Sequence, residues 1–386
     1  MREDSTGKLR KTRKSFPMTE LDLGATTPTT PLATLLASSA FNHELIVYRG
    51  ALTPRELDAP TREIAALATE AAVHDLGWLK RIAVHGEDRF RWLSGMVTNI
   101  VNELGTNAGA WNLVLNSQGR IQGDLTVWRE ADHLELELAA DQFNRLMAHL
   151  ERFIIMDDVE LVELSEETAL GLTGPACDVV LGRLGMPVLS EALTAARVEW
   201  NGLDLRIVRN YGVLAEHYEF WTQEAGIKKL WKALRTAGAT PVGCASLDAF
   251  RIAEGIPAYG VDIAERDLAQ ETSQMRALNF NKGCYLGQEI VERIRSRGNV
   301  HRHLRPLELV GPAPAAGTEL KQTDGTAAGQ ITSAAELPIN GRDRIFALGM
   351  VRGEAELHGQ SLTYSAGEAT GIARILAVPP GLNGRS

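Results

Sequence analysis

Hydrophobic residues along this chain follow two periods, one typical of amphipathic helices and one typical of strands with a single buried face. The helical period recurs in 61–72, 87–93, 143–150 and 227–234. Strand-like apolar runs occur in 79–84, 134–138, 159–164, 168–172 and 203–209. Helices and strands are therefore mixed from the start of the folded region.

Two further alternating runs, 111–116 and 120–128, flank a short segment that ends in Gly119. Glycine adopts the positive φ that tight hairpin turns require, so these runs predict a β-hairpin. The strands and helices do not alternate regularly, as they do in a doubly wound sheet. The sequence therefore predicts an α+β fold with mixed sheets and helices.

The pattern changes after Pro306, where short apolar runs are separated by Gly, Pro and Asn turns. We expect residues 306–386 to form a small C-terminal β-barrel domain. Residues 41–305 then form the main α+β region. Residues 1–40 are rich in Thr, Pro and Ser, which predicts a disordered tail or linker.

Composition and charge exclude several functional classes. Of the 386 residues, 44% are hydrophobic and 23% are charged, as in a soluble globular protein. The net charge of −9 argues against non-specific binding to nucleic acid. The longest uncharged run, 23–42, contains two prolines and is a poor membrane span, and residues 1–20 lack the apolar segment of a signal peptide. We therefore expect neither nucleic acid nor membrane as a partner.

The chain has three cysteines, Cys177, Cys244 and Cys284. Their spacing matches neither a disulfide framework nor paired zinc ligands, so no metal site is predicted and a reducing cytoplasm is the expected location. The common dinucleotide, phosphate-loop and zinc-protease motifs are absent as well.

The strongest local motif is the octet KGCYLGQE at 282–289. Glycines on both sides of Cys284 allow the backbone to bend sharply. Lys282 would favour the thiolate form of Cys284, and a thiolate acts as a nucleophile or a metal ligand. A buried structural cysteine is the competing interpretation, because free cysteines are usually buried.

The octet resembles the signature of the YgfZ-type folate-binding proteins, relatives of the glycine-cleavage aminomethyltransferase, or T-protein. Further segments resemble the same family: 89–93, 97–99, 115–121, 251–257, 259–260, and 297–298 with Arg302. The resemblance implies a multi-domain, aminomethyltransferase-like fold around a central channel that holds tetrahydrofolate. Residues 41–305 would then comprise two intertwined α+β subdomains.

The resemblance also implies which side chains bind the folate. Asp124 matches a T-protein carboxylate that lies beside the reactive nitrogens of the pterin. Trp128, on the same strand face by period two, stands where T-proteins commonly have Tyr. Glu219 matches, across a one-residue gap, a second carboxylate that accepts two hydrogen bonds from the pterin. Both acids can also be explained as exposed strand residues.

Two departures from the T-protein pattern weaken a transferase assignment. Gly123 precedes Asp124 where T-proteins have a second Asp, and Leu247 stands where they have Arg. The octet, by contrast, marks the branch linked to the maintenance of iron-sulfur enzymes. The leading hypothesis is a tetrahydrofolate-binding accessory protein for iron-sulfur cluster assembly or repair, with Cys284 as its functional thiol and Lys282 tuning that thiol.

The partners expected under this hypothesis are a folate and iron-sulfur enzymes or cluster-assembly proteins. Whether the protein is an enzyme stays open. The alternative is a folate-dependent aminomethyltransferase or other one-carbon enzyme, in which Asp124 orients or deprotonates the attacking amine. A third possibility is a folate-binding interaction scaffold in which Cys284 is dispensable.

A basic cluster at 301–305 contains His301, Arg302, His303 and Arg305. It could contact the glutamyl tail of a folate or be solvated, and we favour the solvated interpretation.

Overall fold

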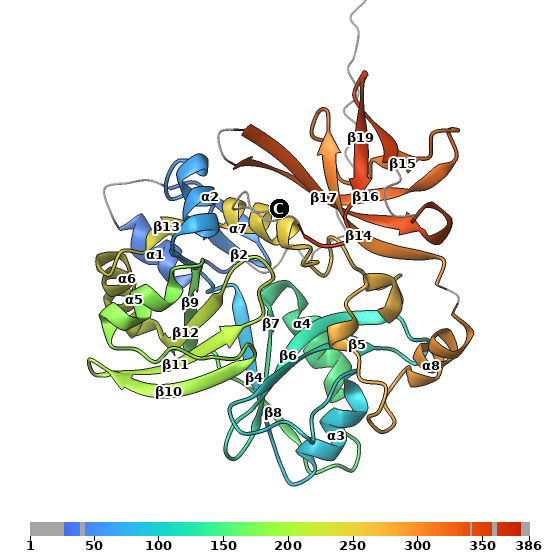
Figure 1. Cartoon of the computed structure of the whole chain (residues 1–386). Coiled ribbons are helices and arrows are strands. Elements are labelled where there is room, and N and C mark those ends of the chain that lie inside the picture. Colours follow the sequence, from blue (N-terminus) through green and yellow to red (C-terminus); the bar gives the residue numbers. More distant parts are fainter. Residues whose placement is uncertain (1–26, 39–42, 299, 340–341, 357–360, 380–386) are drawn as a thin grey trace, which may run out of the picture.

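A computed structural model describes residues 27–38, 43–298, 300–339, 342–356 and 361–379. Its strands form two open sheets, a closed barrel and a separate two-stranded ribbon of β1 (Leu45–Tyr48) and β2 (Ala51–Pro54). Figure 1 shows the barrel packed at one end of the body that the two open sheets form. The predicted α+β class with a C-terminal barrel is confirmed.

The first open sheet is antiparallel, with five strands in the order β5-β6-β7-β4-β8. Its strands are β4 (Leu79–His85), β5 (Gly109–Leu115), β6 (Ile121–Arg129), β7 (Leu134–Ala139) and β8 (Glu160–Glu163), and its helices are α3 (Arg89–Met96) and α4 (Ala140–Glu151). The predicted hairpin is β5 and β6, with Gly119 at φ +71° in the turn. Leu125 and Val127 of β6 pack with α3 and α4 on one face, so Asp124 and Trp128 belong to the other.

The second open sheet has six strands in the order β10-β11-β12-β9-β3-β13. Its strands are β3 (Ala72–Asp75), β9 (Glu167–Thr173), β10 (Thr194–Trp200), β11 (Leu203–Asn210), β12 (His217–Gln223) and β13 (Thr240–Val242). The helices of this region are α1 (Pro31–Ala37), α2 (Pro60–Thr69), α5 (Cys177–Leu184), α6 (Ile227–Thr236) and α7 (Cys244–Glu254), with the 3-10 turn η1 (Glu224–Gly226). The apolar stripe predicted at 227–234 is buried against this sheet.

Helix α1 corrects the expectation that residues 1–40 form a linker. Thr30 caps the helix by accepting a hydrogen bond from the Ala33 amide at 3.2 Å, and Pro31 occupies the first turn, where its missing N–H costs nothing. Leu32 and Ala33 are each only 1% exposed. Leu32, with the partly buried Leu35 and Leu36, packs into the hydrophobic cluster of the second sheet, so this segment docks although its composition is that of a linker. Residues 1–26 and 39–40 of the predicted linker lie outside the described residues.

The barrel closes in the order β14-β17-β16-β15-β18-β19. Its strands are β14 (Arg302–Val310), β15 (Glu319–Lys321), β16 (Ala327–Ile339), β17 (Arg342–Arg352), β18 (Ser361–Ala366) and β19 (Ala369–Ile375), with η4 (Gly353–Ala355) after β17. Three short elements connect the open sheets to the barrel: η2 (Ala269–Thr272), η3 (Met275–Ala277) and α8 (Gln288–Arg297). The barrel therefore begins a few residues before the predicted boundary at 306.

Three of the four residues of the basic cluster bind acids, which differs from the solvated interpretation, whereas His301 is exposed. Arg302 binds the carboxylates of Asp267, at 2.7 Å, and Glu271, at 3.1 Å. Arg305 binds Glu356 at 2.9 Å, and His303 bonds to the same carboxylate. Asp267 and Glu271 come from the segment around η2, so Arg302 attaches the barrel to that segment, whereas Glu356 follows η4 and its contacts lie within the barrel.

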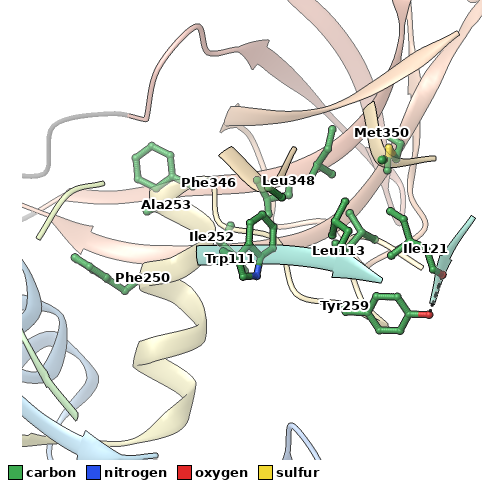
Figure 2. Packing of buried hydrophobic residues seen from close by; sticks show 14 of the residues in the cluster. Trp111, Leu113, Ile121, Phe250, Ile252, Ala253, Tyr259, Phe346, Leu348 and Met350 are labelled. Atoms are coloured by element: carbon green, nitrogen blue, oxygen red, sulfur yellow. Dashed lines mark hydrogen bonds between the residues drawn. The ribbon is translucent and has the colours of Figure 1, made fainter. Parts of the chain in front are cut away.

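One hydrophobic cluster joins the barrel to the first sheet and to α7. Figure 2 shows Trp111 of β5, Phe250 of α7 and Leu348 of β17 in this cluster. The Tyr259 hydroxyl in the same cluster donates to the Ile121 carbonyl at 3.4 Å. These buried contacts hold the barrel against the face from which β5 and β6 reach the functional site.

Where the two open sheets meet, an arginine of each sheet stacks on a tryptophan of the other. Arg81 of β4 stacks on Trp221 of β12, with its guanidinium 4.8 Å from the ring centre. In return, Arg206 of β11 stacks on Trp128 of β6 at 4.9 Å. All four side chains are at most 2% exposed. Cation–π contacts stabilise most when they are desolvated. These four residues, called the seam below, therefore orient one sheet against the other.

Buried acids neutralise the two arginines. Arg206 binds Glu130 at 2.9 Å, and Arg81 binds Glu135 and Glu167. Burial alone would raise the pKa of Glu130, but Arg206 and its neighbouring cations outweigh burial and lower it. Each buried arginine of the seam is therefore stabilised by acids beside it.

We expect Glu130→Gln to lower the free energy of unfolding by about 3 kcal/mol at neutral pH, because it leaves the charge of Arg206 buried without its closest partner. The pKa of Glu130 is lower in the folded protein, so its contribution is present above the unfolded pKa and is lost as the pH falls through the folded pKa. Urea unfolding followed by tryptophan fluorescence measures both effects.

The matched control is Glu163→Gln, which breaks the half-exposed pair of Lys80 and Glu163. We expect that change to cost less than about 1 kcal/mol. Equal costs at the two positions would contradict the role assigned to the seam.

Candidate functional site

A cavity of about 250 Å³ lies where the two open sheets, α7 and η3 meet. Its polar wall comes from β6, β7 and β12, which contribute Asp124, Glu137 and Glu219. Two of the residues predicted from the sequence, Asp124 and Glu219, therefore line the same cavity although they belong to different sheets. The third acid, Glu137, was not predicted.

Two side chains bind Asp124, one from β5 and one from α4. Its Oδ2 accepts a hydrogen bond from Trp111 Nε1 at 3.1 Å, and its Oδ1 accepts one from Gln142 Nε2 at 2.9 Å. Gln142 Oε1 also accepts from the Asp124 amide at 3.0 Å. Both carboxylate oxygens are therefore oriented before any ligand binds.

Glu219 is held in a similar way on the second sheet. Its Oε1 accepts from Asn210 Nδ2 at 2.6 Å, and its Oε2 accepts from Trp221 Nε1 at 2.9 Å. Glu137 accepts from Trp128 Nε1 at 3.1 Å. Burial raises the pKa of Glu137 well above its ordinary value, and the charge and hydrogen bonding of Glu219 raise it further. The surroundings of Glu137 therefore favour its protonated form.

A chain of hydrogen bonds crosses the cavity wall from α7 to β3. His217 Nε2 lies 3.0 Å from the Glu254 carboxylate, His217 Nδ1 lies 3.1 Å from Thr173 Oγ1, and Thr173 Oγ1 lies 2.9 Å from His74 Nε2. Burial alone would lower the pKa of His217, but Glu254 outweighs burial and raises it. Burial, aided by the charge of His217, lowers the pKa of His74 to about 3. Gly171 provides the space for the His74 ring, since a Cβ at this position would overlap it.

Trp128, predicted to stack on the ligand, lies outside the cavity lining. Its ring is fully buried in the seam between the sheets, under Arg206. It faces the same side of β6 as Asp124, as the period of two predicts, but the second sheet covers that side at its position. The aromatic rings that line the cavity beside Asp124 include Trp111 and Tyr211.

Cys284 is exposed and is not among the residues that line this cavity. The other two cysteines are buried, and burial raises the pKa of Cys177 far above its ordinary value and that of Cys244 to about 12. The structural interpretation therefore applies to Cys177 and Cys244, whereas the octet presents its thiol to solvent.

Lys282 has a different environment from the one expected. Its ammonium group donates to the carbonyls of Ser94, Val97 and Asn99 at 2.8, 2.6 and 2.7 Å. These bonds use all three of its N–H donors. Burial lowers the pKa of Lys282 to about 8. Lys282 therefore ties the octet to the end of α3, and no N–H remains to bond a thiolate.

Of the two octet glycines, only the second is required by close packing. Gly287 has φ +83°, and a Cβ at this position would lie 2.6 Å from the Asn116 carbonyl oxygen. Nothing lies within 4 Å of a Cβ placed at Gly283. After Cys284, at Gly287, the octet packs closely against the β5–β6 turn. Before Cys284, at Gly283, there is space for a larger side chain.

Several cavity residues were not predicted because the sequence around each of them has no distinctive pattern. Glu137 belongs to a strand of alternating Leu and Glu, which predicts solvent on the acidic face. His74 and Thr173 come from distant strands and form no local motif. Arg276 is a single cation in an irregular segment, and only the tertiary structure brings it to the cavity.

This architecture defines the class: two open sheets around an acidic cavity, followed by a closed barrel, form a GcvT-like aminomethyltransferase fold. Residues 40–282 match the family model of the GCVT N-terminal domain, so the chain belongs to this family. Aminomethyltransferases of the family use tetrahydrofolate. The expected relationship to T-proteins is confirmed, whereas the YgfZ-type branch stays a prediction.

Known relatives cover most of the chain. An aminomethyltransferase of Rubrobacter xylanophilus is 26% identical over 311 residues, which make up 78% of this chain and 82% of that protein. A putative chloroplastic transferase of Arabidopsis thaliana is 25% identical over 310 residues, 79% of this chain and 71% of that protein. The crystal structure of the glycine cleavage system aminomethyltransferase T from Bartonella henselae has the same fold, with a TM-score of 0.82 and 20% identity over 92% of this chain and 98% of that chain.

The described residues contain neither a membrane-spanning helix nor a cluster of metal-ligating side chains. Every helix there is too short or too polar to cross a membrane. The same residues contain no group of three or more His, Cys, Asp or Glu side chains arranged to hold a metal ion.

We expect Glu137→Gln to stabilise the folded protein at neutral pH. In the wild type, the folded protein keeps the Glu137 proton to a higher pH than the unfolded chain does, so stability falls as the pH rises between the two pKa values. This fall can reach about 1.4 kcal/mol per pH unit from a single group. Glutamine cannot ionise, and it can still accept from Trp128 and donate to Glu219. Urea unfolding at several pH values measures the flattened profile.

Glu254→Gln is the opposite control, because Glu254 is ionised in the folded state. Burial alone would raise its pKa, but His217 and the amides of Val213 and Leu214 outweigh burial and lower it. We expect this change to destabilise the protein at neutral pH. A loss of stability in both variants would show that Glu137 is ionised too.

Proposed function

We propose that the chain binds tetrahydrofolate in the cavity between its sheets and acts, as a YgfZ-type protein, in the assembly or repair of iron-sulfur clusters. Glu219 and Asp124 hold the pterin end of the folate, and Cys284 is the functional thiol. The observation that carries the folate part is the meeting of these two preoriented acids in one cavity.

The cavity suits a reduced pterin by its donor and acceptor chemistry. A pterin presents an amino group and ring N–H groups, which require acceptors. Glu219 and Asp124 supply carboxylate oxygens, while Trp111 and Tyr211 supply aromatic walls. Tetrahydrofolate, when bound, supplies the ring nitrogens that carry one-carbon groups.

The position of Cys284 supports an accessory role over a purely folate-based one. The thiol is exposed and outside the cavity lining, so a partner protein can reach it without entering the folate cavity. The iron-sulfur role itself rests on the resemblance of the octet. A free, exposed thiol also fits a reducing cytoplasm.

A folate-dependent aminomethyltransferase is the second candidate, favoured by the family and by its relatives. In that case Asp124, beside the reactive nitrogens, orients or deprotonates the amine. Against it, the residue before Asp124 is Gly123, which is buried, and Leu247 supplies an apolar side chain to the cavity at the T-protein arginine position. An assay of aminomethyl transfer by the purified protein separates the two candidates.

We expect Glu219→Gln to weaken tetrahydrofolate binding about tenfold or more. The amide replaces an ionised acceptor of two hydrogen bonds with a mixed donor and acceptor, at a cost of about 1.5 to 3 kcal/mol. Isothermal titration of the purified protein measures the affinity. Asp124→Asn should weaken binding less, because its proposed contact is with the reactive atoms. Unchanged affinity in Glu219→Gln would show that the pterin does not bind at Glu219.

We expect Cys284 to alkylate faster than Cys177 and Cys244 in the native protein, because it is the exposed cysteine of the three. Mass spectrometry after brief treatment with iodoacetamide measures the three rates. Cys284→Ala should leave the fold and folate affinity unchanged, since it removes an exposed sulfur from a loop. Protection of Cys284 as strong as that of the two buried cysteines would contradict the arrangement.

The functional test is complementation in cells that lack the protein. If Cys284 acts on cluster assembly or repair, Cys284→Ala will fail to restore the activity of iron-sulfur enzymes, whereas Cys177→Ala is expected to restore it if the variant folds. Full rescue by Cys284→Ala would overturn the functional-thiol proposal and favour the interaction scaffold or the transferase.

A further inference from the structure

Three arginines line the cavity between the sheets, and they differ in whether the protein neutralises them. Arg251 binds Asp248 at 2.7 Å and Asp262 at 2.6 Å. Arg49 has Asp141 at 3.7 Å. The guanidinium of Arg276, in the part of the chain that the structure describes, has only the uncharged Gln274 Oε1 as a side-chain acceptor, at 3.2 Å.

Two aromatic rings hold Arg276 in place. Its guanidinium lies 4.2 Å from the centre of the Trp111 ring and 4.0 Å from that of the Tyr211 ring. Burial lowers its pKa to about 10, so it stays charged at neutral pH. Stacking contacts use the faces of the guanidinium and leave its N–H edge free for an acceptor. A partly buried cation fixed in this way is preorganised for a planar anion.

Arg276 also lies where this cavity meets a second one. The second cavity, about 320 Å³, is bounded by the segment around η3 and by β14 and β17 of the barrel. Both cavities are lined by Tyr211, Glu254, Ile256 and Arg276. Ligand sites commonly measure about 300 to 1,000 Å³, so one extended ligand fits the two cavities better than the first alone.

The charges along the two cavities are unequal. The first cavity contains the acidic pair of Glu137 and Glu219 together with Asp124, which suits the donor-rich end of a ligand. Among the described residues, Arg276 is the one arginine of that cavity that forms no ion pair, although the charges of Asp124 and Glu254 act on it from a distance. A ligand that matches both features has N–H donors at one end and a carboxylate at the other.

We infer that Arg276 recognises a carboxylate of the glutamyl tail, and thereby selects a pterin with an acidic tail over an unconjugated pterin. This inference rests on the proposed folate function. The bond is a charge-assisted one between the N–H edge of the guanidinium and a carboxylate, and the two aromatic rings limit the entropy lost on forming it. Arg276 is thus a specificity-determining residue, outside the chemical step.

The test compares tetrahydrofolate with 6-methyltetrahydropterin, which has no tail, by titration into wild type and Arg276→Gln. We expect Arg276→Gln to weaken tetrahydrofolate about tenfold or more and to leave the tail-free pterin unchanged. Arg276→Lys keeps the charge without the planar fork and should lose less. If Arg276→Gln fails to fold, Arg276→Lys still tests the inference through a loss confined to tetrahydrofolate.

The matched control is a stacked arginine outside both cavities. Arg344 stacks on Phe346 at 5.0 Å and pairs with Glu308 at 2.8 Å but lines neither cavity, so Arg344→Gln should leave both affinities unchanged. To identify the source of the carboxylate, p-aminobenzoylglutamate and glycine are titrated as competitors. Competition by p-aminobenzoylglutamate that Arg276→Gln abolishes supports the tail, whereas competition by glycine alone overturns it in favour of an amino-acid substrate.

Failure of this inference can be told apart from failure of the folate proposal. If Arg276→Gln weakens both pterins equally, or neither, the inference is overturned, while a loss of both in Glu219→Gln leaves the folate proposal standing. If the wild type binds neither pterin, the proposed function falls and the inference falls with it.

Discussion

The geometry of the site depends on two cation–π contacts between the sheets, of Arg81 with Trp221 and of Arg206 with Trp128. Each arginine lies on one sheet and its aromatic partner on the other, so neither sheet can shift without breaking both contacts. The same tryptophans donate their indole N–H groups to Glu219 and Glu137 (Figure 1 shows the strands that carry them). The contacts that align the sheets therefore also position the two acids.

This arrangement explains why the cavity is acidic without being excessively charged. Two carboxyl groups brought together in a buried place cannot both ionise at low cost, so the pKa of Glu137 is raised well above its ordinary value. Glu254 is stabilised in a different way, by His217 and two backbone amides. The cavity thus offers carboxyl acceptors beside an acid whose protonated form is favoured, and Arg276, which forms no ion pair among the described residues, lies at the junction with the second cavity.

The octet and the cavity are separate features of the molecule that share a scaffold. Lys282 and Gly287 attach the octet to α3 and to the β5–β6 turn, and β6 also carries Asp124. The folate proposal and the thiol proposal therefore involve different surfaces of the protein. In this structure the role of Lys282 is to hold the loop in place, which leaves the exposure of Cys284 as the physical basis for its reactivity.

The sequence alone determined the local structure and part of the chemistry. Periodicity identified the amphipathic helices, the β5–β6 hairpin and the C-terminal barrel, because a helix or a strand needs only its own residues to define a buried face. Motif resemblance brought out Asp124, Glu219 and Cys284.

Only the tertiary structure decided which alternating faces meet solvent. Trp128 and Glu137 share the pattern of exposed strand residues, yet the second sheet covers both. The hydrogen-bonded chain to His74 and the aromatic clamp on Arg276 are assembled from elements far apart in the sequence. Such contacts depend on how sheets and domains pack, and no local pattern of residues records that packing.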